Sequence, residues 1–138
     1  MTASTTECVD TRDMIAVHTA FRREFRLAPG LVRGTAVGDA SRASIVGAHL
    51  GAEEQHILPL AARSLSAAEW QQLGEEGFAA LPKNQLSMAF GAIMYQGSPE
   101  VISSMLTHAP VLPRLLMPML GPRAYARYAR RVHGTTKP

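Results

Sequence analysis

The sequence has few of the features that mark secreted or membrane-spanning proteins. Cys8 is its only cysteine, so an intrachain disulfide is excluded. No apolar run approaches the roughly 20 residues that a helix needs to cross a bilayer. Residues 1–10 also lack the basic start and apolar segment of a secretion signal. We therefore expect a cytoplasmic protein that has no membrane partner.

Charged residues are scarce as well, at 18% of 138 residues, whereas hydrophobic residues make up 46%. This balance argues against disorder, and the length suits one domain with a buried core. No segment alternates apolar and polar residues over the length of a strand, so we predict an all-α fold. We expect residues 1–10 to form a flexible tail and residues 11–138 a single helical domain. Within that domain, 11–65 should bear the functional side chains and 66–138 should add C-terminal helices.

Local signals mark where several helices begin or end. A helix is predicted from about residue 40 to 63, and Pro59 should kink or end it. Ser66 and Glu69 have the spacing of a capping box, which opens the next helix. Further helix starts are expected at Ser98-Pro99-Glu100 and, for the last helix, at Gly121-Pro122.

Basic residues are concentrated in the first helix and near the C-terminus, and the net charge is +3. A basic face can bind nucleic acid or acidic lipid head groups. The pattern is also that of an ordinary solvated helix face, which we favour, and we expect no nucleic-acid partner. The C-terminal group comprises Arg123, Arg127, Arg130 and Arg131.

Three ionisable side chains share one side of the helix predicted at 40–63. At about 100° per residue, Glu53 lies about 40° from His49, and His56 lies about 20° to its other side. This side also carries apolar residues that should face the core, so the carboxylate needs a partner. Glu54 could replace Glu53 after a small rotation of the helix.

His18, on a first helix predicted at about 11–27, faces the core in the same way. Helical bundles often bind a metal between His and Glu side chains that project inward from facing helices. Imidazole with carboxylate suits iron, manganese or zinc. The alternative is an ordinary buried network in which Glu53 pairs with His56 or Arg22. The residues that we predict as metal ligands are His18, His49, Glu53, Glu54 and His56.

The run His49-Leu-Gly-Ala-Glu-Glu-Gln-His-Ile-Leu-Pro59 resembles the HHE motif of hemerythrin-like cation-binding domains. In that motif a His-x-x-x-Glu precedes acidic residues and an apolar stretch that ends in proline. His18 is similar to the family's leading histidine, and the segment from Leu65 onward resembles the C-terminal helices of one bacterial branch. The resemblance implies a four-helix bundle with two non-heme irons. It implies O2 or NO binding, redox sensing, iron handling or peroxide breakdown.

The chain departs from this family because it has only one His-x-x-x-Glu helix and one leading histidine. His108 and His133 lie in no recognisable ligand motif. Three outcomes stay open: a homodimer that completes the metal site, a single weaker site with water ligands, or a metal-free chain that acts as an interaction module. No general acid or nucleophile stands out, so the sequence leaves open whether the protein is an enzyme. The small ligand that we expect is O2, NO or peroxide.

Overall fold

The computed structural model describes residues 8–27 and 38–138, and every regular element in these ranges is helical. The prediction of an all-α fold is thus confirmed. Within the same ranges, no helix combines the length and apolar character that crossing a bilayer requires. The elements are α1 Arg12–Leu27, α2 Gly38–Ala52, the π-helical turn η2 Glu53–Ile57, α3 Leu58–Ser64, α4 Ala67–Ala79, α5 Leu86–Gln96, α6 Pro99–His108 and α7 Val111–His133.

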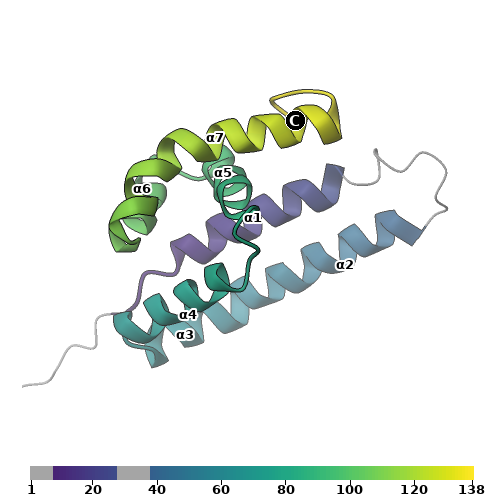
Figure 1. Cartoon of the computed structure of the whole chain (residues 1–138). Coiled ribbons are helices and arrows are strands. Elements are labelled where there is room, and N and C mark those ends of the chain that lie inside the picture. Colours follow the sequence, from purple (N-terminus) through teal and green to yellow (C-terminus); the bar gives the residue numbers. More distant parts are fainter. Residues whose placement is uncertain (1–7, 28–37) are drawn as a thin grey trace, which may run out of the picture.

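Helix α1 lies at the centre of the molecule (Figure 1). It packs against α5 and α6 on one side and against α2 on another. Small residues on its inner face, Ala16 and Ala20, allow this close approach, because they add little bulk between the helix axes. The core consists of Ala16, Ala20, Ala92, Ile93, Val101, Ile102, Tyr125 and Ala129.

Helices α5 and α7 form the most extensive helix pair. They touch at two glycines: a Cβ atom placed on Gly91 would collide with the carbonyl group of Gly121. The expectation that the last helix starts at Gly121-Pro122 is therefore wrong, because α7 already begins at Val111 and runs through both residues. Gly121 serves the contact with α5, and Pro110, which directly precedes the helix as its N-cap, marks its actual start.

The predicted helix starts at Ser66 and Ser98 are confirmed. The Ser66 hydroxyl accepts the amide of Glu69 at 3.3 Å, and the Glu69 carboxylate accepts the amide of Ser66 at 2.8 Å. This completes the capping box before α4. Ser98 likewise accepts the amide of Val101 at 3.3 Å and opens α6.

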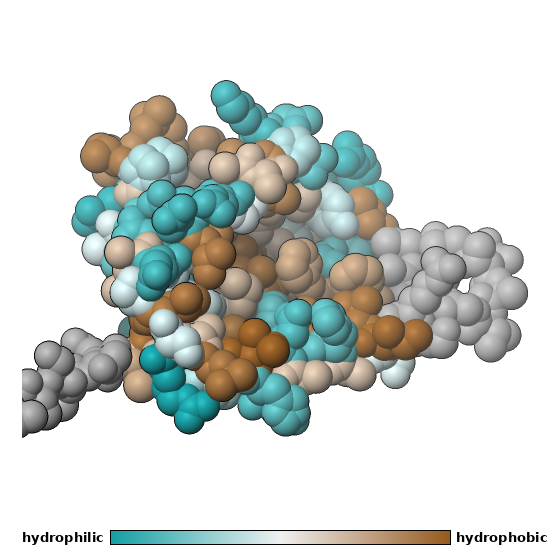
Figure 2. Space-filling model, turned by 90° about the horizontal axis from the view of Figure 1, so that it is seen from below, coloured by the Kyte–Doolittle hydropathy of each residue, from teal (hydrophilic) through white to brown (hydrophobic). Residues whose placement is uncertain are grey.

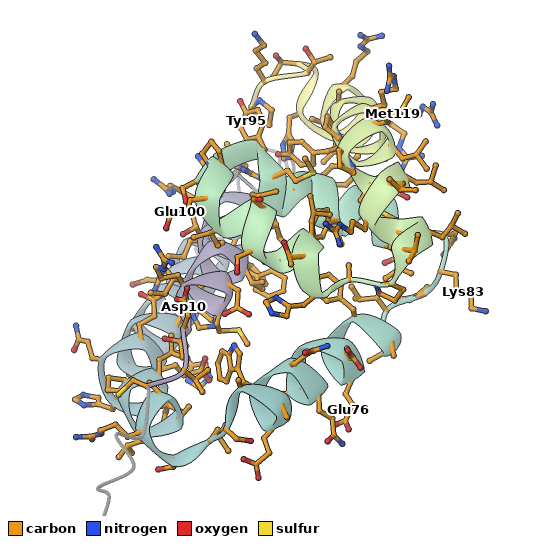
Figure 3. The ribbon with its side chains drawn as sticks, turned by 90° about the vertical axis from the view of Figure 1, so that its left-hand side faces the viewer. Asp10, Glu76, Lys83, Tyr95, Glu100 and Met119 are labelled. Atoms are coloured by element: carbon orange, nitrogen blue, oxygen red, sulfur yellow. The ribbon has the colours of Figure 1, made fainter. Side chains whose placement is uncertain are left out.

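Helix α4 makes few contacts with the other helices. None of its residues is buried, and it runs as an arm below α5, α6 and α7 in Figure 3, where Glu76 marks its position. Two contacts attach it: the indole of Trp70 donates to the Asp13 carboxylate at 3.1 Å, and Phe78 packs on Phe90 with ring centroids 6.1 Å apart.

Part of the expected N-terminal tail lies outside the described residues, which begin at Cys8. The amide of Val9 donates to the carbonyl of Ala62 on α3 at 2.9 Å. Asp10 then accepts hydrogen bonds from the Arg12 side chain at the start of α1. These contacts place the entry to α1 beside the end of α3.

Candidate functional site

Four of the five predicted ligands come together between α1 and the end of α2. His18, on α1, is only 5% exposed. Its Nδ1 lies 3.0 Å from Oε1 of Glu54, and its Nε2 lies 3.5 Å from Oε2 of Glu53. The two glutamates thus approach the two nitrogens of one buried imidazole.

The Glu53 carboxylate lies between two imidazoles. Its Oε1 is 3.0 Å from Nε2 of His49, one helical turn earlier, and its Oε2 faces His18. The side chain of His49 is 71% exposed, whereas that of His18 is 6% exposed. The cluster is therefore closed toward α1 and open toward solvent at His49.

Glu54 fixes the orientation of His18. It accepts a hydrogen bond from Arg22, also on α1, at 2.7 Å. This bond holds the pKa of Glu54 below its ordinary value despite partial burial, and the bond to His18 adds to the effect. An ionised Glu54 can only accept a hydrogen bond, so Nδ1 of His18 is the donor, and this contact directs Nε2 toward Glu53.

That orientation brings Nε2 of His18 to 3.5 Å from Oε2 of the Glu53 carboxylate. A proton on Nε2 or a metal cation between the two groups would make this contact favourable. A carboxylate that orients one imidazole nitrogen while the other points to a cation is a common arrangement at metal sites in proteins.

A π-helical turn positions these glutamates. The amide of Leu58 donates to the carbonyl of Glu53, five residues earlier, which widens the helix at η2. Pro59 follows at once, and a proline has no amide to donate and crowds the carbonyl four residues before it. The helix therefore relieves the kink that we expected at Pro59 by widening the turn before it. Turns of this kind occur often at functional sites.

His56 does not join the other four residues. It lies on the π-turn and is exposed. The angles that grouped it with His49 assume a regular α-helix, and the wider turn changes the direction of every side chain that follows Glu53. In the described part of the chain, no group of three or more His, Cys, Asp or Glu side chains is arranged, as it stands, to hold a metal ion.

A second, partly buried carboxylate was not predicted from the sequence. Glu24 of α1 accepts hydrogen bonds from the hydroxyls of Tyr125 at 2.8 Å and Tyr128 at 3.2 Å, and lies 3.1 Å from Nε2 of His133. Burial opposes its ionisation, but these bonds and the charge of Arg23 outweigh burial and lower the pKa of Glu24. The cluster fastens α1 to α7.

Arg23 completes this second cluster. It is 4% exposed, donates to the carbonyl of Ala92 at 3.0 Å, and its guanidinium lies 4.7 and 4.8 Å from the ring centroids of Tyr95 and Tyr125, which adjoin each other. Such cation–π contacts are strong when water is excluded. Apart from the neighbouring Glu24, these partners lie far away in the chain, 69 residues in the case of Ala92, so no local motif could have revealed the cluster.

Comparison with known proteins gives no relative for the chain. No protein family, no curated protein and no solved structure matches it.

Proposed function

We propose that this chain is a hemerythrin-like, non-heme metal-binding protein, built as a shortened helical bundle with additional C-terminal helices. The observation that carries the proposal is the Glu53 carboxylate between the Nε2 atoms of His18 and His49, which come from two different helices. Two imidazoles and one carboxylate form a donor set that suits iron. The resemblance of the sequence around His49 to the HHE motif supports the same metal.

The residues take different parts in this proposal. His18, His49 and Glu53 supply the donor atoms, and Glu54, held by Arg22, keeps Nδ1 of His18 protonated. Glu53 now occupies the space between the imidazoles, and its half-exposed side chain has room to turn toward a cation. Bound iron would supply an open position for O2, NO or peroxide.

A second copy of the chain would complete the site. Three donors can hold one iron with open positions, and a twofold axis would duplicate them and so provide for the two irons of the family without new sequence. His49 faces outward, and the segment that carries it also exposes Ile45, Ile57 and Leu60. Figure 2, which views the molecule from the side of α2 and α3, shows apolar patches among hydrophilic side chains on this face.

The test is the metal content of the chain, purified without a histidine tag and reconstituted with Fe²⁺, Mn²⁺ or Zn²⁺ in separate samples. We expect iron in a fixed ratio to protein, and loss of most of it in His18→Ala and His49→Ala. His108→Ala is the matched control, because His108 is an exposed residue at the end of α6 whose ring hydrogen-bonds to the carbonyl of Ser104 in the same helix. A wild-type chain that retains no metal contradicts the proposal.

The same experiment tests the dimer. The mass in solution should be that of two chains when iron is bound, and His49→Ala should lower both the iron content and the dimer fraction. A metal-loaded monomer would contradict the completion of the site by a second copy and leave the ligand assignment intact.

The second candidate function is a metal-free interaction module. It is favoured by the pairing of Glu53 with both imidazoles, which already satisfies the carboxylate without a cation. In this case a chelator would leave the circular dichroism spectrum and the self-association of the protein unchanged. Loss of either on chelation would exclude this candidate.

A further inference from the structure

The first half of α7 exposes an unusual amount of apolar surface. Val111 is 75% exposed, Leu112 67% and Leu115 65%, although all three belong to a regular helix. The helix packs on α5 through its second half, where Gly121 and Tyr125 are buried. The set comprises Val111, Leu112, Leu115, Leu116, Met119 and Leu120, and the labelled Met119 points away from the body of the molecule in Figure 3.

The second half of the same helix is basic. No Asp or Glu occurs after Glu100, so residues 101–138 carry positive charge only. The arginines of α7 are all exposed, and within the described residues none of them forms an ion pair with a carboxylate. These side chains are Arg114, Arg123, Arg127, Arg130 and Arg131.

The apolar and basic residues lie on one side of α7. At about 100° per residue, members of both groups fall within a sector of about 60°: Leu112, Leu116, Met119, Arg123 and Arg130. The buried residues Tyr125 and Ala129 lie outside this sector. One outward face therefore presents aliphatic side chains along its first half and guanidinium groups along its second half.

We propose that this face of α7 docks on a lipid surface with anionic head groups. The aliphatic residues would enter the boundary between head groups and acyl chains, and the arginines would bind the negatively charged head groups. The positive charge without a carboxylate complements such a surface, and the exposed apolar area supplies the part of the binding that salt does not screen. Because no described helix can span a bilayer, α7 would lie in the plane of the interface.

Two other partners fit the face less well. The hot spots of protein interfaces are enriched in Trp, Tyr and Arg, with Leu and Val under-represented, whereas the exposed apolar residues here are Leu, Val and Met. Nucleic acid would use the arginines but leave the aliphatic half of the face in water. We expected a solvated basic face and no membrane partner from the sequence. The exposed aliphatic residues beside the arginines change that expectation.

The experiment is co-sedimentation of the full chain with vesicles of phosphatidylcholine alone or mixed with phosphatidylglycerol. We expect binding to the anionic vesicles and weaker binding at high salt. Arg123→Gln and Arg130→Gln should each weaken it by about fivefold. Leu112→Gln combined with Leu116→Gln should weaken it at every salt concentration. Leu73→Gln is the matched control, since Leu73 is 51% exposed on the acidic α4.

Several outcomes would overturn the proposal. The first is that the chain does not sediment with any vesicle, and the second is that it binds neutral and anionic vesicles equally. The third is that RNA releases the wild-type chain fully from the vesicles, at an RNA concentration at which the double leucine variant still binds RNA. A wild-type chain that self-associates through these leucines and ignores vesicles would assign the face to a second copy. Circular dichroism on each variant separates loss of binding from loss of folding, and the arginine variants test the proposal if the leucine variant does not fold.

Discussion

Two carboxylates connect α1 to its neighbouring helices. Glu54 reaches α1 from η2 and accepts from Arg22, and Glu24 reaches from α1 to the tyrosines of α7. Both have lowered pKa values because hydrogen bonds to the charged form outweigh burial. Neighbouring residues of α1, Arg22 and Arg23, thus serve two clusters with different roles. The two carboxylates are similarly exposed, 22% for Glu54 and 24% for Glu24, but the first cluster opens to solvent at His49, whereas Arg23 and Tyr125 of the second are buried.

The lowered pKa of Glu54 predicts how the stability of the fold depends on pH. A group with a depressed pKa in the folded state stabilises the fold above its ordinary pKa, about 4.3, and this stabilisation is lost as the pH falls through the folded value. Glu54→Gln should therefore lower the free energy of unfolding by about 1 kcal/mol at neutral pH and by less in acid. The measurement is urea unfolding at a series of pH values.

Glu75→Gln is the control for this prediction. Glu75 is exposed on α4 and accepts only from Gln71 of its own helix, a bond that an amide oxygen can also accept. Its replacement should leave the dependence on pH unchanged. A Glu54→Gln chain with the same acid profile as the wild type would show that the bond between Arg22 and Glu54 is not formed in solution.

At the scale of the helices, the close contact between α5 and α7 depends on Gly91, because a glycine has no side chain to separate them. Gly91→Ala should lower the free energy of unfolding by about 1–3 kcal/mol, because the new methyl group meets the backbone of Gly121 and the helices must separate. Gly74→Ala is the matched control on α4, where a Cβ atom meets nothing within 4 Å. It should be neutral or stabilising by up to about 1 kcal/mol. Chemical unfolding measures both, and equal effects would contradict the helix pairing.

The sequence predicted those elements whose signals are local. The capping box at Ser66 and the serine cap at Ser98 depend on side chains within three residues of each other, and the structure confirms both. The start of α7 was misplaced because a Gly-Pro pair usually ends or begins a helix. Here Gly121 instead contacts Gly91 of α5, which lies 30 residues earlier in the chain. Information of that kind does not lie in the local sequence.

The candidate site also combines features with a local sequence signal and features that depend on the three-dimensional structure. His18, His49, Glu53 and Glu54, which we predicted as metal ligands, lie near one another, because helical spacing is enough to place them on facing helices; their role as ligands stays a prediction. The sequence did not predict that Glu54 pairs with Arg22 or that His56 is exposed. Both follow from the π-turn, which regular helical geometry does not contain.

At the scale of the whole molecule, stability is distributed unevenly around α1. Its contacts with α5 and α6 bury the core, whereas α4 has no buried residue. Segments with little buried area and exposed backbone hydrogen bonds open first. The amides of α4 should therefore exchange with deuterium well before those of α5, a helix of similar length.

Mass spectrometry of peptides from the exchanging protein measures this difference within one molecule, so no variant is needed. Peptides of α4 that exchange as slowly as those of α5 would show that another surface covers α4 in solution. Addition of iron should slow the exchange of α2 and leave α4 unaffected if the proposed metal site is formed.

The π-turn at Glu53–Ile57 also accommodates one extra residue within an otherwise continuous helix. A turn that holds one residue more than its neighbours shifts the angular phase of all that follows, so α2 and α3 do not share one count around their axis. If this segment were superposed on a regular helix, the side chain of either His49 or Leu60 could keep its direction, but not both. An alignment with a regular helix therefore needs a one-residue gap opposite the π-turn. The gap is best placed after Glu54, so that Glu53 and Glu54 keep their spacing from His49.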